Sequence, residues 1–205
     1  MGDERSPPTD ADVIAASFPE PQRFAVLFDR HASAVHRYVA SRVRPGEVDD
    51  VVSETFVVAF RTRARYDPAY ENARPWLLGI ATNVLRQHHR SEGRRLARLR
   101  AVVRTLDHDL DPAETVSAAV DNAAESDRVL RALTRLDDRY RDVLLLAASA
   151  DLSYEEIARA LGIPVGTVRS RLTRGRRRLR ELLTPGGQYE SDANHVTPST
   201  EGTLG

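Results

Sequence analysis

The 205-residue sequence contains no cysteine and no lysine, so its thirty basic side chains are all arginine. The lack of cysteine excludes a disulfide-stapled secreted scaffold, a zinc finger, an iron–sulfur protein and a catalytic cysteine. Long apolar runs are also absent, since the longest covers residues 143–148 and a membrane-spanning helix needs about 20. No export signal opens the chain. We therefore expect a cytoplasmic protein without membrane spans, metal or cofactor.

The chain also lacks a net charge, but its charges are unevenly distributed. Residues 84–104 and 165–183 each hold seven arginines and one acid, whereas residues 105–127 hold seven acids and no basic residue. Blocks of one charge are commonly interaction surfaces, although an arginine-rich helix face can also be a solvated exterior. Zero net charge therefore does not exclude a nucleic-acid-binding protein.

Three segments have compositions that do not favour a packed core. Residues 1–21, with acids and prolines, are predicted to form a disordered acidic tail, and residues 185–205 a disordered C-terminal tail. Residues 96–124 lack a clear helical period toward their end and contain an Asp-Pro pair at 111–112. This segment is predicted to be a flexible acidic linker between two domains.

The first predicted domain, residues 22–95, carries the spacing of amphipathic helices. Apolar side chains recur at gaps of three, four and seven in residues 23–43, in residues 47–64 and again from Pro75 onward. Three such helices can close a small helical bundle. Because no strand pattern is evident, the expected fold class is all-α.

The second predicted domain, residues 125–184, ends in a helix-turn-helix pattern. Ser153 and Glu156 have the spacing of a capping box, Gly162 suits the position after a helix end, and Pro164 starts a final helix. In a helix-turn-helix the first helix supports the second, whose N-terminal half enters the major groove. The alternative is an ordinary helical hairpin with a basic exterior.

The two helices of this pattern have their apolar side chains on the sides that face each other, and the final helix has polar side chains on its outer side. Ile157, Ala158 and Leu161 are expected to pack against Val168 and Leu172. An arginine that binds guanine O6 and N7 through two hydrogen bonds contributes about 1–3 kcal/mol of base discrimination. The outward residues near the helix start are Arg169, Ser170, Thr173 and Arg174. Further along, Arg176, Arg177, Arg178 and Arg180 are expected to meet phosphates or only solvent.

Two separate motifs resemble one protein family. Residues 153–183, preceded by LDDRYR at 136–141, resemble the region 4 domain of sigma-70 family RNA polymerase sigma factors. VDDVVSETF at 48–56 is similar to region 2.2, and WLLGIATN at 76–83 is similar to regions 2.3–2.4. A chain with only these two domains and a short linker resembles the extracytoplasmic-function (ECF) subfamily.

For region 4, the resemblance implies that the last helix reads the −35 promoter element as duplex DNA. The implied residues are Arg169, Ser170, Arg171, Thr173 and Arg174, with Arg177 nearby. Some family members carry an aromatic residue where this chain has Thr173. The −35 sequence preference of relatives therefore cannot be transferred.

For region 2, the resemblance implies capture of the separated non-template strand at −10. The candidate residues are Asn83, Arg86, Gln87, Arg90 and Arg94, of which Asn83 helps to form a base pocket in the family. Tyr66 and Tyr70 could stack on bases, whereas Trp76 is expected to pack in the core. Gln87 stands where many members have Asp or Asn, so the −10 preference is also open.

The resemblance further implies that the region 2.2 helix docks on core RNA polymerase. The implied residues are Asp49, Asp50, Ser53 and Glu54. From the residues alone, a solvated helix face is the preferred explanation, and only the resemblance favours docking. The acidic linker would follow the RNA exit channel of the polymerase, or act as a solvated tether.

The sequence therefore predicts a sigma factor, which is not an enzyme, with core RNA polymerase and promoter DNA as partners. An anti-sigma factor is a further candidate partner. One alternative is a helix-turn-helix regulator that acts without polymerase. Another is a sigma-like interaction protein that does not initiate transcription.

Overall fold

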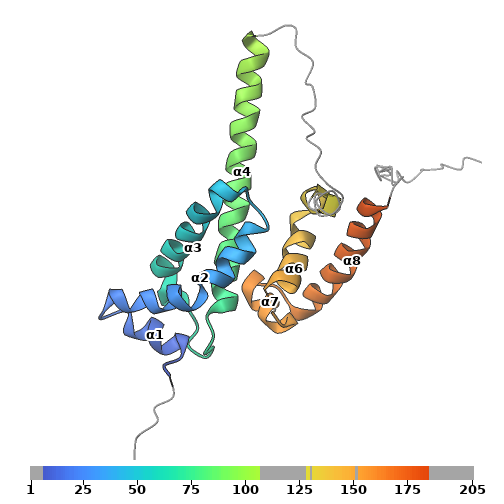
Figure 1. Ribbon diagram of the computed structural model, residues 1–205. Helices are drawn as coiled ribbons and strands as arrows, with labels where there is room; N and C mark the ends of the chain where they lie inside the picture. Colours follow the sequence, from blue (N-terminus) through green and yellow to red (C-terminus); the bar gives the residue numbers. More distant parts are fainter. Residues whose placement is uncertain (1–6, 107–127, 130, 151, 185–205) are drawn as a thin grey trace, which may run out of the picture.

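The computed structural model describes residues 7–106, 128–129, 131–150 and 152–184, and within residues 92–106 it describes only the backbone (Figure 1). The regular structure of this described part is helical, with no strand, as the sequence predicts. None of its helices is both long and apolar enough to cross a bilayer. Most of the predicted acidic linker and the predicted C-terminal tail lie outside the described residues.

Residues 7–106, here called the N-terminal domain, form four α-helices joined by short turns. The helices are α1 (Asp10–Ala16), α2 (Ala25–Ala40), α3 (Val48–Thr62) and α4 (Arg74–Leu106), and the 3-10 turns are η1 (Pro21–Phe24), η2 (Pro45–Glu47) and η3 (Arg63–Arg65). Leu27 and Tyr38 of α2, Val51 of α3 and Leu78 of α4 are almost fully buried between these helices. The hydroxyl groups of Tyr38 and Thr82 lie 2.8 Å apart and link α2 to α4 within this core.

Residues 128–184, here called the C-terminal domain, contain a further set of helices. Residues 131–135 are helical, and they are followed by α6 (Asp138–Ser149), α7 (Tyr154–Leu161) and α8 (Val165–Leu183). The capping box is present, because Ser153 accepts from the backbone N–H of Glu156 and the Glu156 carboxylate accepts from that of Ser153. Gly162 ends α7 with a φ of 63°, a conformation that glycine adopts without strain.

The two domains pack directly against each other, with α4 beside α7 (Figure 1). Gly79 of α4 makes this contact possible, since a Cβ atom there would lie 2.2 Å from the carbonyl oxygen of Ala160. Most of the buried apolar residues of the two domains form one continuous core. The pattern of the sequence predicted two domains but not this interface.

The prediction of a disordered tail through residue 21 is wrong for residues 7–21. Thr9 and Asp12 form a capping box that starts α1, and Asp10 is buried, where it accepts hydrogen bonds from Arg30 and from the backbone N–H of Ala73. His31 Nε2 lies 2.6 Å from the same carboxylate. Composition alone predicts solvated acids here, but Asp10, Asp12 and Glu20 each have a specific partner.

The predicted linker from residue 96 begins inside a helix, because α4 continues to Leu106. Residues 96–106 are mainly Leu, Ala, Arg and Val, and the first strong helix breaker is Pro112. Leu, Ala and Arg have high helix propensities, so nothing in this stretch ends the helix.

Candidate nucleic-acid and polymerase interfaces

The last helix, α8, is fixed to α7 by a small apolar core. Ile157, Val168 and Leu172 are almost fully buried, and Ala158 is also buried. In the turn, the backbone N–H of Ile163 donates to the carbonyl of Ala158 at 3.0 Å. The predicted inward side of this helix pair is therefore confirmed for these residues, while Leu161 is half-buried.

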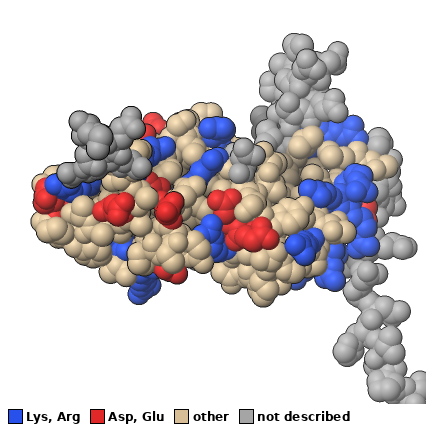
Figure 2. Space-filling model, turned by 90° about the horizontal axis from the view of Figure 1, so that it is seen from below, with Lys and Arg blue, Asp and Glu red and all other residues tan. Residues whose placement is uncertain are grey.

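The opposite side of α8 carries the candidate duplex-reading residues. Arg169, Ser170, Thr173, Arg174 and Arg177 are exposed, and Arg171 is half-buried. The hydroxyls of Ser170 and Thr173 donate to carbonyls of the same helix, at 3.0 and 3.1 Å. Figure 2 shows arginines gathered on the side of the molecule that α8 occupies, with acidic side chains mainly over the other elements. This arrangement places several hydrogen-bond donors on one side of the molecule.

Gly175 is a position in α8 whose role sequence reasoning missed. It is buried, and a Cβ atom there would lie 3.2 Å from Cδ1 of Leu144 and 3.3 Å from Cβ of Tyr140. A glycine inside a helix with strong periodicity is a signal of close packing. Here it lets α8 approach α6 closely.

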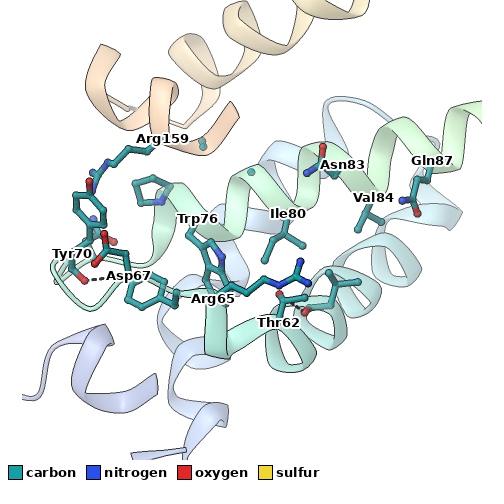
Figure 3. A pocket seen from close by; sticks show the side chains of 16 residues that line it. Thr62, Arg65, Asp67, Tyr70, Trp76, Ile80, Asn83, Val84, Gln87 and Arg159 are labelled. Carbon is teal, nitrogen blue, oxygen red and sulfur yellow. Dashed lines mark hydrogen bonds between the residues drawn. The ribbon is translucent and has the colours of Figure 1, made fainter. Parts of the chain in front are cut away.

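A cavity of about 520 Å³ lies beside α4, at the predicted base pocket (Figure 3). Trp76, Ile80, Asn83 and Gln87 face it from α4. Its other walls come from the end of α3 and η3, from the loop before α4 and from α7, and include Thr62, Arg65, Tyr66, Tyr70, Arg159 and Ala160. The contributions of Thr62, Arg65 and α7 were not predicted.

The aromatic residues of this cavity have different roles. Trp76 is half-buried and lies edge-to-face with Tyr66, with ring centroids 5.1 Å apart, so it packs and also lines the cavity. The hydroxyl of Tyr66 donates to the carbonyl of Tyr70 at 2.5 Å. Burial of Tyr66 and the nearby charge of Asp10 raise the pKa of its hydroxyl to about 12, so it remains a neutral donor. Tyr70 is exposed, and its ring faces the guanidinium group of Arg159.

The predicted −10 residues are not all brought to the cavity. Asn83 and Gln87 line it, whereas Arg86 turns toward the C-terminal domain and binds Asp142 with Nε at 2.8 Å and Nη2 at 2.5 Å. Arg90 is exposed on another side of α4, beside Glu54 and Ser91. The side chain of Arg94 lies outside the described residues.

The candidate polymerase-docking residues share one exposed face of α3. Asp49, Asp50, Ser53 and Glu54 are exposed. Asp49 and Asp50 lie in the first turn, where their negative charges interact favourably with the positive end of the helix dipole. Val51, Val52, Thr55 and Phe56 are buried on the opposite face.

Two exposed apolar residues adjoin this acidic face. Val57 of α3 and Phe28 of α2 are each 46% exposed, and the ring of Phe28 lies 4.9 Å from that of Phe56. The helical spacing of apolar residues in 23–43 predicts Phe28 on the core side of its helix, and this prediction is wrong. The structure instead makes a mixed acidic and apolar surface, which is typical of a protein-binding site.

Among the residues that the structure describes, no group of three acidic or histidine side chains could hold a metal ion. His88 lies 3.5 Å from Glu47, and the rings of His88 and His89 are 6.1 Å apart. A helix-turn-helix beside a second, arginine-bearing helix with an aromatic cavity defines an all-helical DNA-binding transcription factor.

Comparisons with known proteins identify the family. Residues 27–95 match the model for sigma-70 region 2, and residues 126–179 match that for sigma-70, region 4. The chain is 36% identical to the RNA polymerase sigma factor CarQ of Myxococcus xanthus over 163 residues, covering 78% of this chain and 88% of that one. It is 31% identical over 174 residues to the ECF sigma factor SigL of Mycobacterium tuberculosis, covering 84% and 96%.

A solved structure of CnrH, in complex with the cytosolic domain of CnrY, is also similar to this chain. The TM-score is 0.60 at 31% identity, and the match covers 85% of this chain and 96% of CnrH. The chain belongs to the ECF group of the sigma-70 family of RNA polymerase sigma factors. Members of this family are transcription initiation factors.

Proposed function

We propose that this sigma factor divides promoter recognition between its two domains, with α8 reading the −35 duplex and α4 capturing the melted −10 strand. The observation that carries the −35 assignment is the exposed polar side of α8 above a buried α7–α8 core. Arg169 and Arg174 have the donor geometry for guanine, and Ser170, Arg171, Thr173 and Arg177 complete the surface. Duplex DNA would meet the N-terminal half of α8 in its major groove.

For the −10 strand, we assign an unstacked base to the cavity beside α4. Asn83 offers an amide that can bind a base edge, and Trp76 offers an aromatic wall. Gln87 lines the same space, and Arg86, Arg90 and Arg94 would follow the phosphates. Single-stranded DNA requires this combination of stacking surface and positive charge.

For polymerase docking, we assign the exposed face of α3. Asp49, Asp50, Ser53 and Glu54 supply charge and polarity, and the exposed parts of Val57 and Phe28 supply apolar contact. An interface with an apolar centre and a charged rim is common among protein complexes.

We further propose that the protein works in the cytoplasm and performs no catalysis itself, since RNA synthesis belongs to the polymerase. Its partners are core RNA polymerase and promoter DNA. Because the similar protein CnrH was solved with the cytosolic domain of CnrY, we also expect a protein partner of the anti-sigma class.

Run-off transcription with purified core polymerase tests the −35 assignment. Arg169→Ala and Arg174→Ala should each lower initiation by about 10- to 100-fold at promoters with guanine at the contacted position, because a bidentate contact contributes about 1–3 kcal/mol. Arg180→Ala, at the far end of the same exposed surface, is the matched control and should weaken all promoters equally and slightly. Equal effects of Arg169→Ala and Arg180→Ala across the promoter set would contradict the assignment.

The same assay separates the proposed function from its alternatives. If the protein binds core polymerase but initiates at no promoter of a genomic library, it is an interaction protein. If it binds paired half-sites tightly without polymerase, it is a conventional regulator. Initiation at specific promoters, dependent on core polymerase, is the expected result.

A further inference from the structure

The loop between η3 and α4, residues 66–73, supplies one wall of the cavity beside α4 and is here called the cavity loop (Figure 3). Four of its residues line the cavity, namely Tyr66, Asp67, Tyr70 and Asn72. The loop also bonds to itself: the Tyr66 hydroxyl donates to the carbonyl of Tyr70 at 2.5 Å, and the N–H of Tyr70 donates to that of Asp67 at 3.2 Å. These local bonds shape the loop but do not attach it to the rest of the domain.

Two hydrogen bonds of Asp10 attach the cavity loop to α1. The carboxylate of Asp10 accepts from the backbone N–H of Ala73 at 2.8 Å, and the backbone N–H of Asp10 donates to the carbonyl of Glu71 at 2.9 Å. Ala73 is fully buried, so water cannot replace the carboxylate as a partner of its N–H. A residue 63 positions earlier in the chain thus holds the end of the loop.

The carboxylate of Asp10 is itself held by α2. Nη1 of Arg30 donates to Oδ1 at 2.8 Å, and Nε2 of His31 lies 2.6 Å from Oδ2. The side chain of Asp10 is only 7% exposed. Since these contacts all come from the N-terminal domain, the anchor remains wherever the C-terminal domain lies. Because α2 holds the carboxylate directly, the anchor does not rely on the capping box that starts α1.

A cavity distinguishes one base from another only when its hydrogen-bonding and stacking groups are held in place. Such groups lose much of their effect when they move by about 1 Å. Asn83 lies on the long helix α4, which fixes its backbone, whereas the cavity loop contains no helix of its own. The loop wall of the cavity therefore depends on its contacts with other elements.

We propose that Asp10 is a positioning residue for −10 recognition, which fixes the cavity loop and so sets how strictly the cavity discriminates between bases. Asp10 does not itself line the cavity, so it acts through the loop. This inference rests on the proposed −10 function. It extends the −10 site to α1, which lies outside residues 27–95, the part of the chain that matches sigma-70 region 2.

Asp10→Asn tests the proposal, because it keeps the shape of the side chain and replaces one oxygen by an NH2 group. Arg30 donates to one oxygen of the carboxylate and the Ala73 N–H to the other. Either orientation of the new amide therefore sets its NH2 group against an N–H donor, and the loop should shift. Asp29→Asn is the matched control, with the same charge change at an exposed acid of α2.

Run-off transcription with core polymerase measures the effect on two promoter sets. In one set each −10 position carries each of the four bases, and in the other the −35 element is varied. Asp10→Asn should reduce the preference among bases at the −10 position that the cavity reads by about threefold to tenfold, and should leave the −35 preferences unchanged. A smaller folded fraction would instead lower initiation at all promoters by one common factor. Asp29→Asn should keep both sets of preferences.

Hydrogen exchange in the free full-length chain measures the loop directly. The N–H of Ala73 and its neighbours in the cavity loop should exchange about tenfold or more faster in Asp10→Asn than in the original chain or Asp29→Asn. This acceleration is read relative to the amides of α8, so that a general loss of stability is not mistaken for a loosened loop.

Tyr66→Phe is a second variant that acts on the loop without touching α1. It removes the hydroxyl that donates to the carbonyl of Tyr70 and keeps the ring that packs on Trp76. It should reduce the same −10 preference by a smaller factor, about twofold to threefold, because it removes one neutral hydrogen bond. Circular dichroism shows which variants reach the original helix content. If Asp10→Asn does not, Tyr66→Phe decides the result.

Unchanged −10 preferences in the variants that fold would overturn the proposal, and so would a uniform fall in initiation at every promoter. Reduced preference without faster exchange in the loop would overturn it too, since Asp10 would then act by another route. The original chain tests the proposed function separately. If it shows no preference among −10 bases, the proposed −10 function fails. If it shows a clear preference that Asp10→Asn retains, only the role of Asp10 fails.

Discussion

The two candidate DNA-binding helices differ in how accessible they are. On α8, Arg169 and Arg174 are exposed, and the helix lies at one edge of the molecule (Figure 1). On α4, Arg86 is paired with a buried acid, and the neighbouring cavity has one wall supplied by the other domain. The proposed duplex-reading surface is exposed, whereas the proposed surface for single-stranded DNA is partly occupied by contacts with the other domain.

This difference suits an order of events in promoter opening. Promoter DNA is a duplex before it melts, so under the proposed division of roles only the −35 surface has to be open at the start. When polymerase holds both domains at a fixed spacing, two weak sites act together through their high effective concentration. The predictions below test how far the two domains are independent, from the largest expected effect to the smallest.

Truncation of a buried side chain in the C-terminal domain should destabilise the whole chain. Leu172 is 1% exposed, and Leu172→Ala should lower the free energy of unfolding by about 2–5 kcal/mol through lost burial and the cavity left behind. Because the core is continuous across the domains, we expect one cooperative transition in urea, shifted as a unit. Two separate transitions, of which only one moves, would show that the domains unfold independently.

Charge reversal on α3 should affect polymerase binding and leave the DNA surface of α8 intact. Asp49→Arg combined with Asp50→Arg should weaken binding to core polymerase by roughly 100-fold, about 3 kcal/mol, because like charges at an interface cost several kcal/mol. Circular dichroism should show an unchanged fold. Glu20→Arg with Glu71→Arg, two exposed acids elsewhere in the same domain, is the control and should leave affinity nearly unchanged. Equal affinities of the two double variants would contradict the docking assignment.

Much of the fold could be predicted from the sequence, because its signals are local. The capping box at Ser153 and Glu156, the turn at Gly162 and the apolar spacing of α3 each specify their element within a few residues. Local signals also misled: the acids of residues 1–21 indicate a solvated tail by composition alone. Only the tertiary structure shows that Asp10 meets Arg30 and the backbone of Ala73.

The candidate sites were likewise predictable where they depend on local pattern and not where they depend on tertiary contacts. The exposed side of α8 follows from helical period, and so does the acidic face of α3. The partnership of Arg86 with Asp142 does not, since 56 residues separate the two and no local pattern joins them. Gly79 and Gly175 were visible as helix glycines, but what each approaches depends on a second helix.

Asp10 offers a pH-dependent test of the junction between α1 and the rest of the N-terminal domain. Burial alone would raise the pKa of this carboxyl, but hydrogen bonds from His31, the Ala73 backbone and Arg30 outweigh it and lower the pKa to about 2. A folded pKa below the unfolded value of 3.8 means that the stabilisation is fully present above about pH 4 and is lost as pH falls toward 2. Its size is on the order of 2 kcal/mol.

Urea unfolding between pH 6 and 2 measures this contribution. Asp10→Asn should lower stability at pH 6 and flatten the pH dependence below about pH 4, since its side chain does not titrate there. Asp29→Asn, at an exposed acid of α2, is the control and should keep the slope of the original chain. If Asp10→Asn leaves the slope of the unfolding free energy against pH unchanged, other carboxylates account for the loss of stability in acid.

The two capping boxes provide the finest comparison between the domains. Thr9→Ala and Ser153→Ala each remove a side chain that accepts from the third residue of its helix, and each should cost about 1 kcal/mol. The consequences should differ, because α1 lies at the edge of its domain whereas α7 is packed between α4 and α8. Hydrogen exchange should therefore speed up only within α1 for Thr9→Ala, but across the α4–α7 contact and α8 for Ser153→Ala. The contrary result is that protection from exchange falls only in the first turn of α7 for Ser153→Ala. That result would show that α7 does not couple the stability of α4 to that of α8.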